Sequence, residues 1–402
     1  MKKLLSFLCL VVVAFVSVFA TGCGKQFDNT KPVDKKDIKV GLICLHNESS
    51  TYDKNFIDSM KRALANLGIS EDQLEVVTGV PEGQDCYDTA VLLAKTCNVI
   101  FADSFGHEDY MIQAAKKYPN VNFSHATGTK AHTEKLDNYS NAFAAIYEGR
   151  YLAGIAAGMK LNEMILSGKI TASQAVIGYV GAFPYAEVKS GYTSFYLGAR
   201  SVCPTATMKV RFTSSWYDYD KEKAACEALI KDGCVLISQH ADSYGAPVAC
   251  EQAGVPNVTY NGTTISECPN TYVVSSKIDW APYYEYAIGQ TLKGEKIATD
   301  WVGTIETGSV KLDALGTNAA AGTQAAIDAA KAKLQNGKLH VFDTSTFTVK
   351  GAHLTEYQAD IDDDGTFTPD TNVIADGYFH ESEYRSAPAF DLDIDGIELI
   401  NE

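Results

Sequence analysis

The stretch VIFADSFGHEDYMIQAAKKYPNVNFSHA, residues 99–126, contains one complete unit of the pattern that decides the fold. Its apolar run at 99–102 predicts a buried strand, residues 111–117 predict a helix that ends before Pro119, and residues 121–123 predict the next strand. A strand, a helix and a second strand in this order form a right-handed crossover between parallel strands. The stretch therefore predicts an α/β protein with a parallel sheet.

The same alternation of strand and helix recurs on both sides of this stretch, in two sets. The first set begins with a strand at 38–43 and ends with the strand at 121–123. The second set follows an interval near residues 130–145 and runs from an apolar helix at 151–161 to a strand at 258–260. Two successive sets predict two doubly wound lobes, each built on a parallel sheet.

The composition fits a protein of this size and disfavours some classes of partner. The chain has 402 residues, of which 46% are hydrophobic, enough for substantial cores. Its formal net charge of −16 disfavours binding to nucleic-acid backbones and to anionic lipid surfaces. The sequence contains no GxSxG, HExxH or Walker A motif and no GxGxxG after the first strand, so no enzyme class is indicated.

The N-terminus carries the features of a secretory signal peptide. Two lysines precede an apolar run at residues 4–20, and Ala-Thr-Gly then leads to Cys23. Small residues before a cysteine predict a lipoprotein signal over residues 1–22, whose cleavage leaves Cys23 to carry a diacylglycerol and an acyl chain such as palmitate. The polar residues 23–37 are expected to form a flexible tether between the lipid and the fold. The alternative is an ordinary cleaved signal, with Cys23 incidental.

Eight of the ten cysteines lie beyond Cys23, and they form no CxxC pair and no Cys/His cluster with zinc spacing. Several lie in apolar runs, so we expect most of them to be buried thiols. Export permits disulfides, and one or two bridges stay open at this point.

An acidic segment near the C-terminus spaces its carboxylates as a calcium loop does. Asp360, Asp362 and Asp364 alternate before a glycine, but the twelfth position is Thr371 rather than a bidentate glutamate. A solvated hairpin tip is the competing interpretation, so no resident metal is expected and calcium is the alternative. The segment belongs to an acidic C-terminal extension, about residues 341–402, to which the sequence assigns no function.

Candidate ligand-binding residues follow the strands, because doubly wound sheets bind ligands outside the carboxyl ends of their strands. Trp216 follows the strand at 208–210, and Tyr52 and Phe105 follow strands of the first set. We predict that these three rings grip a flat aromatic ligand, with Trp216 as the main stacking face. Packing in a core or at a hinge is the alternative for each ring.

Polar residues follow the same strands. Asp103, His240 and Asp242 could hydrogen-bond to the edge of an aromatic ligand, or they could cap the helices that come next. Lys277 could reach a ligand hydroxyl or point into solvent, and the sequence leaves both readings open.

These segments resemble the basic membrane protein family of substrate-binding lipoproteins, the nucleoside-binding components of ABC importers. The resemblance covers about residues 38–315. Its landmarks are DSFGHEDYMIQAAKKYPNVNFSHATG at 103–128, IYEGRYLAGIAAGMK at 146–160, SSWYDYDKEKAACEALIKDG at 214–233 and ISQHADS at 237–243. Motifs typical of a branch associated with purine bases lie at 215–218, 239–243 and 280–284.

The resemblance implies a type I periplasmic-binding-protein fold, in which a hinge joins the lobes and a purine base or nucleoside binds between them. It places the first lobe at residues 38–142 and about 276–309, and the second at about 143–275 and 310–340. It also implies no cofactor, an ABC permease as partner, and a lipid-anchored position on the extracytoplasmic face of the cell membrane.

The chain departs from nucleoside-binding members of the family at two places. Those members carry a Gly-x-Asp-x-Asp segment that grips ribose, whereas residues 260–264 read YNGTT and contain no acid. Lys277 matches the family's lysine only with a shift in position. Both departures favour a free purine base over a nucleoside.

We therefore expect a lipid-anchored solute-binding protein of an ABC importer, and not an enzyme. One alternative is an exported nucleoside hydrolase, which would need a cluster of acids at the end of the first strand, where residues 45–47 read LHN. The other alternative is a ligand sensor or surface antigen that binds without transport.

Overall fold

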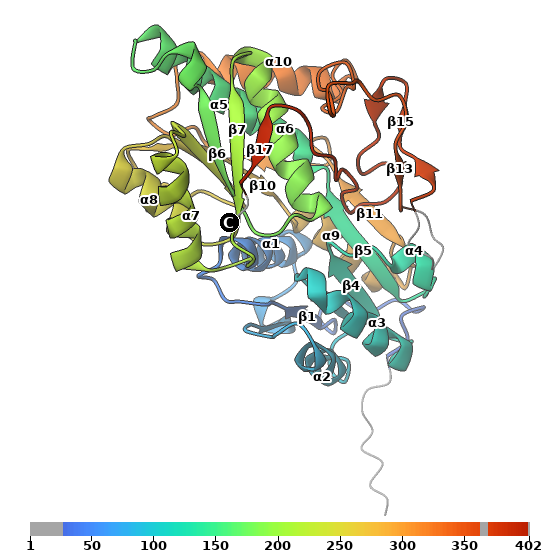
Figure 1. Cartoon of the computed structure of the whole chain (residues 1–402). Coiled ribbons are helices and arrows are strands. Elements are labelled where there is room, and N and C mark those ends of the chain that lie inside the picture. The colour runs from blue at the N-terminus through green and yellow to red at the C-terminus, as the bar shows by residue number, and fades with distance from the viewer. Residues whose placement is uncertain (1–26, 362–368, 401–402) are drawn as a thin grey trace, which may run out of the picture.

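The computed structural model describes residues 27–361 and 369–400, which form two lobes, each with a central β-sheet covered by helices (Figure 1). Among these residues the first lobe has a six-stranded sheet in the order β11-β5-β4-β3-β1-β2, and the second a seven-stranded sheet in the order β12-β10-β9-β8-β6-β7-β17. In each sheet the direction in which successive strands are added changes once. The change lies between β1 and β3 in the first sheet and between β6 and β8 in the second. Such reversals are the switch points at which doubly wound sheets bind ligands, and the predicted α/β class is confirmed.

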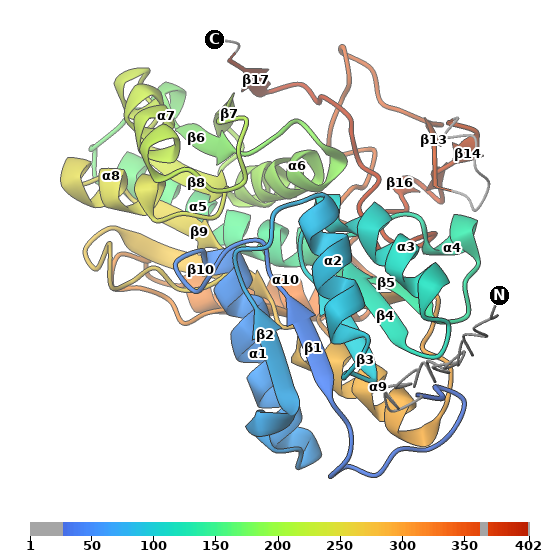
Figure 2. The ribbon, with the colours of Figure 1, turned by 90° about the horizontal axis from the view of Figure 1, so that it is seen from below.

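The first lobe contains the unit quoted above. Its strands, all parallel, are β1 (Val40–Ile43), β2 (Leu74–Val77), β3 (Val99–Ala102), β4 (Asn122–Ala126), β5 (Tyr139–Ala144) and β11 (Asp300–Gly303). Its helices are α1 (Thr51–Leu67), α2 (Gln84–Leu93), α3 (Glu108–Lys117), α4 (Ala131–Glu134) and α9 (Ala281–Lys293). Helices cover both faces of this sheet (Figure 2), which is why β1, β3, β4 and β5 are buried along their whole length.

The second lobe repeats the arrangement with one antiparallel edge. Its strands are β6 (Val176–Gly181), β7 (Thr207–Phe212), β8 (Leu236–His240), β9 (Asn257–Tyr260), β10 (Tyr272–Ile278), β12 (Val310–Leu312) and β17 (Ile397–Leu399), with β12 antiparallel to β10. Its helices are α5 (Ile146–Leu166), α6 (Ala186–Val202), α7 (Tyr219–Lys231), α8 (Gly245–Ala253) and α10 (Thr323–Gln335). The chain crosses between the lobes after β5, after β10 and after β11, and these three crossings form the hinge.

Helices α5 and α6 pack at close range because glycines line their contact. A Cβ atom on Gly154 would overlap the carbonyl oxygen of Phe195, and one on Gly198 would overlap that of Tyr151. The landmark IYEGRYLAGIAAGMK is therefore a helix-packing motif, and it holds α6 against the face of the second sheet.

Two regions differ from the pattern read in the sequence. Residues 139–144 fall in the interval predicted to separate the two sets, yet they form β5 inside the first sheet, because burial rather than a Val/Ile run decides this strand. Residues 27–37 are predicted as tether, but Phe27 is buried and the Val33 amide donates to the Leu292 carbonyl oxygen at 2.9 Å. The prediction of a flexible tether is therefore wrong for these residues.

The eight cysteines from Cys44 to Cys268 are buried free thiols, as expected for most of them, and none of them forms a disulfide. The sulfur atoms of Cys226 and Cys250 lie 3.6 Å apart, in contact but not bonded. No helix within the described ranges combines the length and the apolar character that a membrane crossing requires.

Candidate functional site

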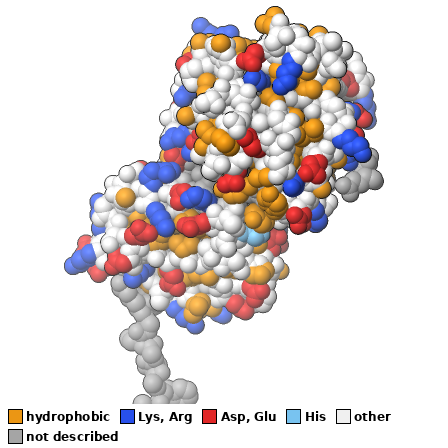
Figure 3. Space-filling view, turned by 90° about the vertical axis from the view of Figure 1, so that its left-hand side faces the viewer, with side chains coloured by type: hydrophobic (Ala, Val, Ile, Leu, Met, Phe, Trp, Pro, Cys, Tyr) orange, Lys and Arg blue, Asp and Glu red, His pale blue; other side chains and the backbone are white. Residues whose placement is uncertain are grey.

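A narrow cavity lies between the lobes, at the switch points of both sheets. Figure 3 shows apolar side chains and a histidine gathered where the two lobes meet. From the first lobe the cavity is lined by Leu45, His46, Tyr52, Asp53, Ser104, Phe105 and Thr127. From the second lobe it is lined by Glu187, Trp216, His240, Asp242, Tyr260 and Asn261.

The lobes touch directly beside this cavity, so the structure represents a closed arrangement. At the start of α1, the backbone amide and the hydroxyl of Thr51 donate to the Asp242 carbonyl oxygen of the second lobe, at 3.0 and 3.1 Å. One turn further along the helix, Asn55 Nδ2 donates to the Ile278 carbonyl oxygen at 2.6 Å.

Aromatic rings form one wall and the mouth of the cavity. Trp216 is half-buried and lies edge-on to Phe183, with ring centroids 5.3 Å apart, and 6.1 Å from Tyr185. Phe105 reaches across from the first lobe to within 5.9 Å of the Tyr185 ring and is itself 43% exposed. Tyr52 lies deeper, where its hydroxyl donates to the Asp103 carbonyl oxygen at 2.7 Å. The three predicted rings thus border the same space.

Phe183 and Tyr185 complete this wall, and the sequence analysis did not single them out. They follow β6, so the rule that places ligands at strand ends does point to their loop. The backbone that leads into α6 decides which side chains of this loop turn toward Trp216. No sequence motif indicates the course of that backbone.

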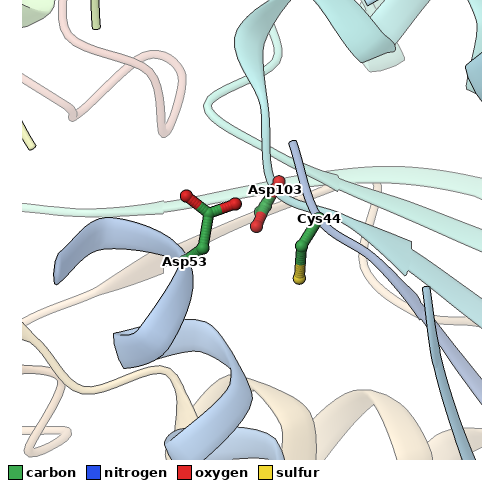
Figure 4. A group of neighbouring side chains, drawn as sticks. All are labelled: Cys44, Asp53 and Asp103. Carbon is green, nitrogen blue, oxygen red and sulfur yellow. The ribbon is translucent and has the colours of Figure 1, made fainter. Parts of the chain in front are cut away.

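Asp103 lies beneath the cavity, in a buried group with Cys44 and Asp53 (Figure 4). The sulfur atom and the nearest carboxylate oxygens of these residues lie within 4.8 Å of one another. The backbone amides of Leu45 and His46 donate to Asp103 Oδ1 at 3.1 Å and to Asp53 Oδ1 at 2.7 Å. The loop that follows β1 therefore holds one oxygen of each carboxylate. The second oxygen of each side chain lies on the side of the other carboxylate.

The surroundings shift the pKa values of these two acids in opposite directions. Burial, with added repulsion from Asp53, raises the pKa of Asp103 well above its usual range. Burial also opposes ionisation of Asp53, but hydrogen bonds from His46, Ser50 and Asp103 outweigh it and leave its pKa lowered. Asp53 therefore ionises more readily than Asp103, and of the two it is Asp53 that lines the cavity.

The polar side of the second lobe is provided by residues after β8 and β9. Burial lowers the pKa of His240, so the ring is neutral, and it lies 4.4 Å from the Tyr260 ring. Burial, with Glu222 adding repulsion, raises the pKa of Asp242 well above its usual range. Tyr260 Oη and Asn261 Nδ2 are buried without a hydrogen-bond partner among the described residues. A bound ligand with polar edges would supply partners for both.

Two cavity residues, Thr127 and Asn261, have left-handed backbones, with φ of 67° and 62°. Asparagine tolerates this conformation, whereas it is strained for a β-branched threonine. Each follows a central strand, β4 or β9, and lines the cavity. Strain of this kind is concentrated at ligand sites, and here it re-aims two side chains toward the space between the lobes.

Lys277 lies away from the cavity. Its ammonium group forms an ion pair with Asp313 at 2.5 Å, and it borders a separate recess that meets the cavity only at Asn261. Of the remaining predicted sites, Cys23, Asp362 and Asp364 lie outside the described residues. The backbone oxygen of Asp360 accepts a hydrogen bond from Arg385 Nη1 at 3.0 Å.

Two known proteins that are similar to this chain are both named as binding proteins. A purine-binding protein of Brucella abortus is 32% identical over 332 residues, which cover 81% of this chain and 88% of the relative. A Haloferax volcanii protein, provisionally named as an ABC transporter glucose-binding protein, is 35% identical over 250 residues, 62% of this chain and 60% of that protein's length.

Solved structures show the same fold at lower identity. An ABC transporter solute-binding protein of Conexibacter woesei has a TM-score of 0.61 at 17% identity, covering 75% of this chain and 98% of its own. One from Aeropyrum pernix has a TM-score of 0.63 at 14% identity, covering 79% and 94%. The family described as Bmp, ABC transporter substrate-binding protein PnrA-like, matches residues 41–341, and the chain belongs to this family of solute-binding proteins.

Proposed function

We propose that this solute-binding protein captures a purine base in the cavity between its lobes and delivers it to an ABC permease. The observation that carries the proposal is the combination of an aromatic wall with buried polar groups that lack partners. Trp216 and Phe105 offer faces and edges to a flat ring. Tyr260 and Asn261 offer hydrogen bonds to its rim. The purine-binding relative from Brucella abortus supports the same ligand class.

A free base is favoured over a nucleoside by what lies next to the cavity. The segment at 260–264 carries no acid to bind ribose hydroxyls. Lys277, which could have bound a hydroxyl, is neutralised by Asp313 instead. The two groups that could bind ribose hydroxyls, an acid at 260–264 and a free Lys277 ammonium, are therefore not available to a nucleoside.

The second candidate ligand is a hexose, and the glucose-binding name of the Haloferax volcanii relative favours it. Aromatic faces also pack against the apolar faces of sugars, so the wall alone does not separate the two classes. Polar atoms that lack a partner among the described residues do not separate the two classes either, because they lie on both lobes, at Thr127 of the first and at Tyr260 and Asn261 of the second. The purine class is favoured because the Brucella abortus relative matches 81% of this chain, against 62% for the Haloferax volcanii relative.

Two further parts of the proposal concern location and chemistry. We infer a lipid anchor on Cys23 that keeps the protein on the extracytoplasmic face of the cell membrane, beside its permease. We also infer that the protein binds without catalysis. Incubation with inosine, followed by chromatography, tests this directly, because release of free hypoxanthine would identify a nucleoside hydrolase instead.

A thermal-shift panel tests the ligand class. Adenine, guanine and hypoxanthine should each be compared with adenosine, guanosine, inosine and glucose at equal concentration. The proposal predicts that at least one base raises the melting temperature more than its own nucleoside does, since ligands that bind only the folded state stabilise it. A shift with glucose and none with any purine would exclude the proposal.

A further inference from the structure

The C-terminal strap, which we define as residues 341–361 and 369–400, lies almost entirely beyond the segment that matches the family. It has a small core of its own. The Phe342 and Phe390 rings stack with centroids 4.2 Å apart, and Phe347 and Phe379 pack against Phe390 at 6.0 and 4.9 Å. Two short hairpins, β13 (Gln358–Ala359) with β14 (Thr371–Asn372) and β15 (Ile374–Ala375) with β16 (Tyr378–Phe379), complete it. The strap is therefore an ordered body and not a loose tail.

The strap is fixed to the second lobe near both of its ends. Its last strand, β17, pairs in parallel with β7 and extends the second sheet. Lys189 of α6 forms an ion pair with Asp393 at 2.7 Å and donates to the Asp391 carbonyl oxygen at 3.0 Å. At the other end, the Tyr147 ring lies 5.4 Å from Phe342, directly after the first hinge crossing.

Between these attachments the strap reaches over to the first lobe. Figures 1 and 2 both show its hairpins beside α4. The Ser386 amide donates to Asp300 Oδ2 at 2.5 Å; Ser386 is buried and the Asp300 side chain is 8% exposed. The same oxygen lies 3.4 Å from His132 Nε2 of α4, within the first lobe. Asp300 is the first residue of β11, which pairs with β5 in the first sheet. The neighbouring Arg385 donates to the carbonyl oxygens of Asp360 and Ala387, which fixes the part of the strap that presents Ser386.

We propose that the C-terminal strap latches the two lobes together through Asp300 and restricts how far the cleft opens. A hinge that relies on three crossings alone lets one lobe rotate freely against the other. The strap adds a fourth connection, which is continuous with the second sheet and hydrogen-bonded to the first. Opening the cleft beyond the reach of this connection must break the contact between Ser386 and Asp300. The inference concerns the hinge and holds whichever solute the cavity binds.

Small-angle X-ray scattering of the ligand-free protein tests the latch. Asp300→Ala removes the acceptor on the first lobe, so the radius of gyration should increase relative to the wild type. Asp300→Asn keeps an oxygen that can accept the Ser386 amide and should restore the wild-type value. Asp232→Ala is the matched control, because it removes the same charge from an ion pair with Arg211 that lies wholly within the second lobe and includes no strap residue, and it should leave the radius unchanged.

A second variant covers the case in which Asp300→Ala fails to fold. Arg385→Ala acts from the strap alone and should increase the radius of gyration in the same direction. Equal radii for the wild type, Asp300→Ala and Arg385→Ala, with folding confirmed by circular dichroism, would overturn the latch. No ligand is added, so this result is independent of whether the protein binds purines.

Discussion

Trp216 and Phe105 lie on opposite lobes, and both keep part of their rings free of protein contacts at the mouth of the cavity. Rigid aromatic side chains give a large contact area for little loss of conformational entropy, which suits a site that must open and close. The deeper residues differ in kind, because Asp103 and Asp242 are buried acids whose pKa values are raised by their surroundings.

Trp216→Ala should weaken binding of the preferred purine by tenfold or more, which corresponds to about 1.4 kcal/mol. The loss follows from removal of the largest ring on the wall, whereas Trp216→Phe keeps an aromatic face and should lose less. Isothermal titration calorimetry measures both. An unchanged dissociation constant for Trp216→Ala would mean that Trp216 serves packing alone.

The folded state should become less stable as pH rises, because the buried Glu222 side chain then ionises. Burial raises its pKa to about 7 from an ordinary value of 4.5, although the backbone amides of Asp218 and Ser243 donate to it. Because the folded state holds the proton more tightly, its contribution to stability is complete below pH 4.5 and is lost as pH rises toward 7. The whole effect is on the order of 3 kcal/mol.

Melting temperatures between pH 5 and pH 8 check this. Glu222→Gln cannot ionise, so its melting temperature should fall less over that interval than the wild type's. Glu148 and Glu381, whose pKa values burial also raises to about 7, remain in both proteins and cancel in the comparison. Parallel pH profiles for the two proteins would count against a buried, titrating Glu222.

Much of the cavity lining could be predicted from residue position alone. Tyr52, Phe105, Trp216, His240 and Asp242 all follow strands, and all five border one cavity, because parallel strands end at a common edge. Asp103 follows a strand too, but its side chain turns beneath the floor toward Cys44. Lys277 faces Asp313 instead, a partner 36 positions away that no local pattern connects to it (313 − 277 = 36). Side-chain direction and distant pairing are the parts that the sequence does not reveal.

At the scale of elements, the contact between α5 and α6 organises the second lobe. Gly198→Ala should destabilise the fold by about 1–3 kcal/mol, because its methyl group would overlap the Tyr151 carbonyl oxygen across the helix pair. Gly289→Ala is the control, since no atom lies within 4 Å of a Cβ at that position in α9. The control should be neutral or stabilising by up to about 1 kcal/mol. Urea denaturation measures both, and equal stabilities would contradict the proposed close packing.

The element pattern was predictable where burial follows from local sequence. β1, β3 and β6 are apolar runs because both faces of a covered parallel sheet are shielded from water. β5 mixes serine, asparagine and aromatic residues, and β17 is three residues long and pairs with a strand nearly two hundred positions earlier. Neither could be identified without the tertiary context that makes it a strand.

At the scale of the whole molecule, two lobes closed over a cavity form a device that can hold a solute and release it on opening. The protein can serve transport only if it is held beside a permease. Cys23→Ala should therefore move the protein from the membrane fraction to the soluble extracytoplasmic fraction without changing its affinity for ligand. Cell fractionation and immunoblotting measure this. A variant that stays with the membrane would contradict anchoring through Cys23.

The central claim is that the cavity between the lobes binds a purine base in preference to its nucleoside. Calorimetric titration of the wild-type protein with adenine and with adenosine, followed by the guanine and hypoxanthine pairs, tests it most directly. The account predicts saturable one-to-one binding of at least one base, near micromolar and about −8 kcal/mol, with its nucleoside bound more weakly. Tighter binding of every nucleoside, or no heat with any purine while glucose binds, would contradict it.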